Sequence, residues 1–167
     1  MILSRYRLLI RVLCVLFFVT VPGALLSMAP VPLAAEELQR LEQSVQQNVN
    51  SERISKHIPQ LNWNERLAAE ARRHAENICN RRFFGHEDPV RGNVDRRLDA
   101  SGIRWRRCAE NIYAGDFDRL VDEAVTAWRL SPGHHKIMLD SMLSEAGVGI
   151  AARQDGTMIV VQEFILK

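Results

Sequence analysis

Three polar residues that can take part in metal or acid–base chemistry lie far apart along the chain: His86, Glu110 and His134. Two neutral imidazoles and one carboxylate can bind a divalent metal such as zinc and leave a coordination position open for water. The same groups can instead provide a general base beside a carboxylate. No short metal-ligand motif is present, so the fold must bring the three residues together. The segments that hold them read Phe-Gly-His-Glu-Asp at 84–88, Ala-Glu-Asn-Ile at 109–112 and Trp-Arg-Leu-Ser-Pro-Gly-His-His at 128–135.

In this order and at this spacing, the three segments resemble the CAP superfamily of cysteine-rich secretory, antigen 5 and pathogenesis-related proteins, and in particular its bacterial SCP-like branch. Weaker matches are Leu-Asn-Trp-Asn-Glu-Arg-Leu-Ala at 61–68, Gly-Val-Gly at 147–149 and Val-Gln-Glu-Phe at 161–164. The resemblance extends over most of the chain from around Asn50 onward. It implies an α+β fold, a three-layer α-β-α sandwich with a short antiparallel sheet, and a central cavity that holds both histidines and the glutamate.

Two residues depart from the pattern of this superfamily. Ser131 stands where eukaryotic members commonly have a second glutamate, three residues beyond Trp128. We expect Ser131 at the edge of the cavity and not as a nucleophile, because it precedes Pro132 at a helix start, where a serine caps free N–H groups. Ala109 replaces the usual glycine before Glu110. His135 lies about 100° further round the helix than His134 and is predicted to point to the surface.

Each of these residues also has a structural interpretation. His86 can bond to the backbone of its own loop, and His134 can pack at a helix start. Glu110 can be a buried carboxylate that accepts hydrogen bonds from neighbouring loops. His57 and His74 lie on polar helix faces and are predicted to be exposed to solvent.

Hydrophobic spacing predicts helices and strands in an order typical of an α+β domain. The first helix is expected to break near residues 48–51. Asp155-Gly156 is a hairpin turn signal between the last two strands. The predicted helices cover residues 36–57, 65–79, 94–100, 118–130 and 131–139, and the predicted strands cover 105–113, 146–153 and 158–166.

Residues 1–35 are predicted to form a signal peptide. Three arginines precede a long run without charge that ends in small residues, which is the order of a secretory leader. The run is also just long enough to span a bilayer, so an uncleaved membrane anchor is the alternative. We expect residues 36–60 to form an N-terminal helix that leads into a CAP domain over residues 61–167.

The predicted leader bears on the net charge of the rest of the chain and on where the protein is expected to be located. It holds three of the 22 basic residues and none of the 20 acidic ones, so the rest of the chain is nearly neutral. A nearly neutral domain gives no reason to expect nucleic acid as a partner. We predict a secreted or periplasmic protein that contacts a membrane only through the leader, should the leader remain.

Two cysteines, Cys79 and Cys108, follow the leader. In an oxidising compartment such a pair can form a disulfide. Whether it does depends on the distance between the two Cα atoms, which the sequence does not supply. A Cys79–Cys108 disulfide and two free thiols are therefore both open.

Two functions compete. The first is a secreted binding protein without catalysis, which holds a lipid, a sterol-like molecule or a protein partner, with zinc at His86 and His134 as a candidate cofactor. The alternative is a metal-assisted hydrolase or peptidase that acts on envelope or extracellular substrates through His86, Glu110 and His134. A third possibility is a structural envelope protein whose polar residues only stabilise its loops. The resemblance implies diverse roles, including lipid or sterol binding and partner recognition, often without demonstrated catalysis, so we favour the binding protein; the fold alone does not select a function.

Overall fold

The computed structural model describes residues 35–167, so the predicted signal peptide lies outside it except for Ala35. No helix in residues 35–167 combines the length and the apolar composition needed to cross a bilayer. The elements are α1 (Ala35–Ser55), β1 (Asn62–Trp63), α2 (Glu65–Arg81), α3 (Val94–Ala100), β2 (Arg107–Gly115), α4 (Leu120–Leu130), α5 (Pro132–Met138), β3 (Glu145–Ala152) and β4 (Met158–Leu166).

The four strands form one sheet in the order β1-β3-β4-β2. The three long strands are antiparallel, as predicted, and β3 and β4 are joined by the predicted hairpin. The two-residue β1 differs, because it pairs with β3 in parallel and makes the sheet mixed. β1 leads directly into α2, which packs on one face of the sheet. β3 pairs with β1 only after α3, β2, α4 and α5 have followed along the chain.

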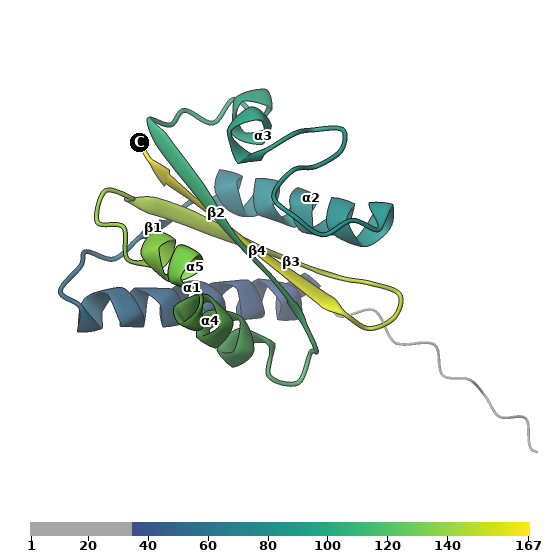
Figure 1. Ribbon diagram of the computed structural model, residues 1–167, viewed down its shortest axis with the longest axis horizontal. Helices are drawn as coiled ribbons and strands as arrows, with labels where there is room; N and C mark the ends of the chain where they lie inside the picture. The colour runs from purple at the N-terminus through teal and green to yellow at the C-terminus, as the bar shows by residue number, and fades with distance from the viewer. Residues whose placement is uncertain (1–34) are drawn as a thin grey trace, which may run out of the picture.

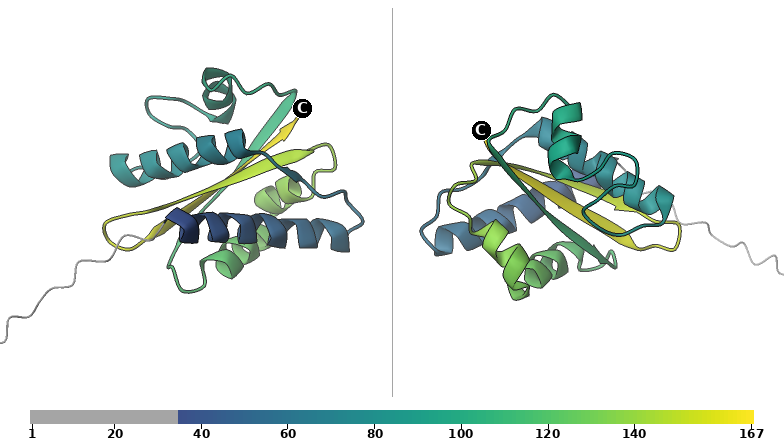
Figure 2. Two further views of the ribbon diagram at one scale, coloured as in Figure 1. Left: turned by 180° about the vertical axis from the view of Figure 1, so that it is seen from behind. Right: turned by 45° about the horizontal axis from the view of Figure 1, so that its top comes forward.

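Helices cover both faces of the sheet, which confirms the three-layer α-β-α sandwich (Figure 1). α2 and α3 lie on one face, and α1, α4 and α5 lie on the other; the view from behind shows the sheet between α1 and α2 (Figure 2). Trp128 and Phe164 belong to the apolar core on the α1 side. Ile78 and Ile159 belong to a separate cluster on the α2 side.

α1 is continuous, and the predicted break near residues 48–51 is wrong. Val45 and Val49 on this helix are fully buried in the core. The Asn50 side chain bonds to the backbone of Leu61, as donor at 3.0 Å and as acceptor at 2.8 Å. Because that side chain is engaged elsewhere, it does not compete for hydrogen bonds with the helix backbone.

α2 begins at the predicted cap and packs closely on β3. The Asn64 side chain accepts hydrogen bonds from the backbone N–H groups of Arg66 and Leu67. Gly149 on β3 faces the helix so closely that a Cβ atom there would lie 2.0 Å from the backbone nitrogen of Arg72. The glycine is therefore required by the close approach of helix and strand.

Both described cysteines are free thiols, so the disulfide alternative is not realised. Cys79 packs at the edge of one apolar cluster on the α2 face, and Cys108 packs at the edge of another. Burial raises the pKa of each thiol to about 11. Both thiols are consequently protonated at neutral pH.

Candidate functional site

The pairing of β2 with β4 decides which polar side chains face which layer. Glu110 lies opposite Glu163, and Asn111 lies opposite Gln162. Because successive side chains of a strand point to opposite faces, the two glutamates share one face and the two amides share the other. Gln162 donates to Gln46 of α1 at 2.9 Å, so the amides face the α1 side and the glutamates face α2 and α3.

The two predicted histidines meet at the outer edge of the sheet. β2 is the last strand of the sheet, so elements from both layers can approach each other around its free edge. His86 comes from the loop between α2 and α3, and His134 lies in the first turn of α5. Their ring centroids are 6.3 Å apart, at an interplanar angle of 50°. The fold therefore brings together residues that are far apart in sequence.

Glu110 joins this pair to the interior. One carboxylate oxygen lies 2.8 Å from Nδ1 of His86, and since a carboxylate only accepts hydrogen bonds, Nδ1–H is the donor. The other oxygen accepts from Arg97. Both oxygens thus have protein partners, and the Nε2 atom of His86 is left for another ligand. In this arrangement Glu110 orients the His86 ring from the buried side.

The two imidazoles have opposite pKa shifts. The hydrogen bond that His86 donates to Glu110 raises the pKa of His86, whose side chain is 56% exposed. Burial, together with the positive charge of His86, lowers the pKa of His134. As the pH rises, His134 loses its proton before His86 does, so its ring becomes available to a metal ion at a lower pH.

α5, the helix that carries His134, contacts β2 through Asn111 and α1 through His135. The buried Asn111 side chain donates to the backbone carbonyl of His134 at 3.2 Å.

The predicted Ser131 cap is wrong, since the Ser131 side chain makes no capping hydrogen bond within the described residues. Instead, the Ser131 carbonyl accepts the backbone N–H of His135 at 2.8 Å. His135 points away from the site toward α1, where its Nε2 lies 3.7 Å from Glu52.

Arg97 is a central residue that the sequence analysis missed. Its side chain is fully buried, and one terminal nitrogen donates to carboxyl oxygens of Glu110 and Glu163, the latter at 3.2 Å. The other terminal nitrogen donates to the backbone carbonyls of His86 at 2.9 Å and Gly92 at 3.1 Å. Arg97 therefore fixes both Glu110 and the loop that carries His86.

Glu163 and His74 complete the buried polar cluster. Burial and the nearby charge of Glu110 raise the pKa of Glu163 to about 8, so it holds a proton at neutral pH. His74 is fully buried, which corrects the prediction of solvent exposure; its Nε2 lies 3.2 Å from the carbonyl oxygen of Gly85. Burial lowers the pKa of His74, so the ring is neutral at pH 7. His74 thus supports the backbone just before His86.

A metal could be held by the two imidazoles only. Within residues 35–167 no group of three or more His, Cys, Asp or Glu residues is arranged to hold a metal ion. The Nε2 atom of His86, whose side chain is partly exposed, and the ring of His134 fit a zinc-type ion as a pair of nitrogen ligands. The hydrogen bond from His86 to Glu110 supplies the outer-shell support that metal-binding histidines commonly have.

Comparisons with known proteins agree with this architecture. The cysteine-rich secretory protein family, CAP, matches residues 46–164. YkwD of Bacillus subtilis is 28% identical over 134 residues, which are 80% of this chain and 50% of YkwD. An extracellular SCP-domain protein from Bacillus anthracis has a TM-score of 0.68 at 26% identity, over 82% of this chain and 45% of that protein. An outer surface protein of Borrelia burgdorferi shares the fold, with a TM-score of 0.71 at 16% identity over 81% and 96% of the two chains.

The chain spans about half the length of YkwD and of the Bacillus anthracis protein. The family match covers more than half of this chain and includes the segments that hold His86, Glu110 and His134. The chain therefore belongs to the cysteine-rich secretory protein (CAP) family and has bacterial homologues.

Proposed function

We propose that the protein is a secreted or periplasmic binding protein whose ligand site is the His86–His134 pair, with a zinc-type ion between the histidines and the ligand. The observation that carries the proposal is the meeting of two imidazoles from opposite layers, 6.3 Å apart. Glu110 orients one of the rings from the buried side. An extracellular location is supported by the relative from Bacillus anthracis, which is described as extracellular.

Two features of the site support a metal. Imidazole nitrogens suit zinc, and two protein ligands leave positions for water and for a polar group of the ligand. NaASP2, which shares the fold at a TM-score of 0.52 and 14% identity, was crystallised with Zn2+. With only two protein ligands we expect weaker binding than at a closed structural zinc site.

The loop of His86 also suggests the kind of ligand. It exposes two large apolar side chains, Phe84 at 57% and Val90 at 69%. Exposed apolar side chains on the loop that carries a site histidine suit a ligand with both polar and apolar parts, such as a lipid, a sterol-like molecule or an apolar patch of a partner protein. The polar part would enter the metal site and the apolar part would lie on the loop.

Hydrolysis is less well supported by the same contacts. Each carboxylate oxygen of Glu110 already accepts a hydrogen bond, one from His86 and one from Arg97, which favours an orienting role for Glu110 over that of a general base. A hydrolase would have to use an imidazole as its base. Its signature would be turnover of an ester or peptide by the native protein that His86→Asn or His134→Asn abolishes and His57→Asn leaves unchanged.

Zinc titration by calorimetry tests the proposal. The purified protein is compared with His86→Asn and His134→Asn, and with His57→Asn as the matched control. His57 is exposed and has φ 59°, a conformation that asparagine tolerates. We expect one zinc ion per chain, lost in both site variants and kept in the control. Absence of binding, or equal binding in a site variant that melts like the native protein, would contradict the proposal.

A further inference from the structure

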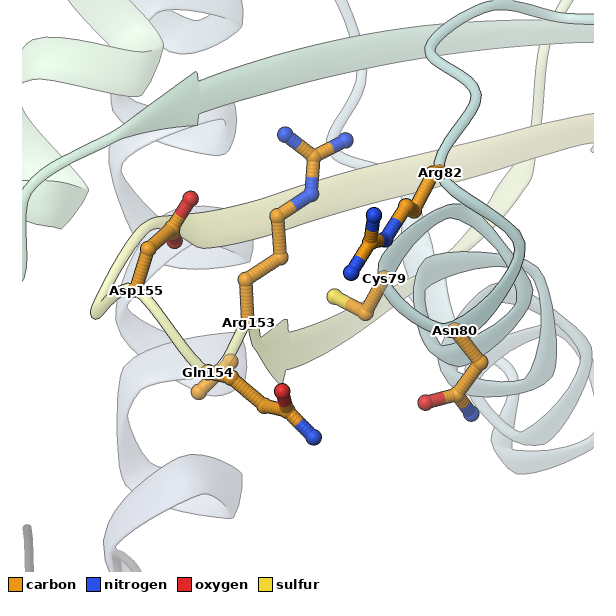
Figure 3. Close-up of a pocket in the computed structure, with 7 residues that line it drawn as sticks. Cys79, Asn80, Arg82, Arg153, Gln154 and Asp155 are labelled. Atoms are coloured by element: carbon orange, nitrogen blue, oxygen red, sulfur yellow. The ribbon is translucent and has the colours of Figure 1, made fainter. Parts of the chain in front are cut away.

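A hollow of about 550 Å³ lies away from the histidine pair, between the end of α2 and the β3–β4 hairpin (Figure 3). Its volume is in the range of sites for small molecules, roughly 300 to 1,000 Å³. The lining is mostly polar, with charged or amide side chains from both walls. The residues used below are Cys79, Asn80, Arg82, Arg153, Gln154 and Asp155.

Two arginines from different elements line the hollow. Arg82 directly follows α2, and Arg153 directly follows β3 (Figure 3). Within residues 35–167 neither guanidinium group forms an ion pair with a carboxylate, and the one side-chain hydrogen bond of Arg153 goes to the carbonyl of Phe83 at 3.0 Å. The Nε atom of Arg153 is buried and has no partner among these residues. Planar guanidinium groups with unused donors suit carboxylate and phosphate oxygens.

The remaining lining residues define the rest of the ligand. Asn80 and Gln154 present neutral amides, which can both donate and accept hydrogen bonds. Hydrogen bonding to Thr157 lowers the pKa of Asp155, which is therefore an ionised acceptor. The Cys79 thiol, whose pKa burial raises to about 11, adds no negative charge and is a poor nucleophile. Two arginines and one aspartate leave a single positive charge, which one anionic group would balance.

We propose that this hollow is a second, separate binding site, which takes a hydroxylated small molecule with one carboxylate or phosphate group, such as a sugar acid or a sugar phosphate. Arg82 and Arg153 bind the oxyanion. Asn80, Gln154 and Asp155 bind the hydroxyl groups. The site does not depend on the His86–His134 pair.

Calorimetry with three probes of similar body tests this site: glucuronate, glucose 6-phosphate and uncharged glucose, at low ionic strength. The variants are Arg82→Gln and Arg153→Gln. Arg81→Gln is the matched control, because Arg81 is exposed, adjacent in sequence and outside the hollow. We expect at least one anion to bind and glucose to fail. Each site variant should weaken anion binding about tenfold, as removal of a charged hydrogen-bond donor does.

The relative affinity of glucuronate and glucose 6-phosphate decides between a carboxylate and a phosphate ligand. Arg82→Gln keeps the test decisive should Arg153→Gln melt early through loss of its bond to Phe83. Failure of both anions to bind, equal binding of glucose, or equal weakening by Arg81→Gln would overturn the proposal. Zinc binding at the histidine pair should be unchanged in Arg82→Gln, so the two sites fail or succeed separately.

Discussion

Glu110 orients the His86 ring and is itself held in place by Arg97. Its two oxygens bond to a partly exposed histidine on one side and to the buried Arg97 on the other. Loss of one partner would leave a buried charge uncompensated, which is usually more destabilising than loss of a surface ion pair. The orientation of the exposed imidazole thus depends on the interior of the protein.

Glu163→Gln should flatten the pH dependence of stability. The folded carboxyl has a pKa of about 8 and the unfolded one about 4.5, so the folded state binds more protons between these pH values. This contribution to stability is fully present below pH 4.5 and is lost as the pH rises through 8. Melting followed by circular dichroism from pH 5 to 8 should show the native protein losing several degrees more than the variant.

Glu76→Gln is the control for this experiment, because Glu76 is an exposed residue of α2. Its melting curve should follow that of the native protein at every pH. Parallel curves for the native protein and Glu163→Gln would show that Glu163 is ionised in the folded state.

The site residues differ in how far the sequence could predict them. Short motifs were sufficient for His86, Glu110 and His134, although their roles in binding stay predictions. His74 could have been found, because residues 67, 71, 74 and 78 form one stripe of α2 and all are buried. Arg97 had a weaker signal: it shares the apolar side of the short α3 with Val94 and Leu98, but its burial depends on carboxyl groups from two other strands.

At the level of elements, contact between α2 and β3 depends on glycine. Gly149→Ala should destabilise the protein by about 1 to 3 kcal/mol, as overpacking of a tight interface does, or prevent folding. Gly133→Ala is the matched control, since an added Cβ atom there would meet nothing within 4 Å. Urea unfolding of both variants measures the difference. Equal stability of Gly149→Ala and the native protein would contradict the close packing.

Hydrophobic spacing predicted most helices and strands to within a few residues, including the short helix that carries His134. Two features depended on contacts remote in sequence. The continuity of α1 depends on Asn50, whose side chain bonds to Leu61. The parallel pairing of β1 depends on β3, more than 80 residues later. Local patterns contain no signal for either.

Over residues 35–167, stability rests on packing and buried polar contacts without a disulfide. Because Cys79 and Cys108 are free thiols, dithiothreitol should leave the melting temperature unchanged. Thiol titration of the denatured, unreduced protein should find both as free thiols. A fall in melting temperature on reduction, or loss of both thiols, would instead indicate a disulfide in solution.

The sandwich also explains why the histidine pair lies where it does. Helices on both faces bury the central strand β4, whereas β2 remains at the edge of the sheet. Because the sheet separates the two helical layers, residues from opposite layers can contact each other only beyond an edge strand such as β2. His86 and His134 do so, and a ligand could reach them there without opening the core.

Nuclear magnetic resonance of the imidazole nitrogens, with zinc added stepwise to protein labelled with 15N-histidine, tests the central claim most directly. We predict that Nδ1 of His86 carries a proton before zinc is added, and that His86 and His134 then respond together and saturate at one equivalent. His57 should not change at that ratio. A response of only one of the two site histidines, or of neither, would contradict the paired site.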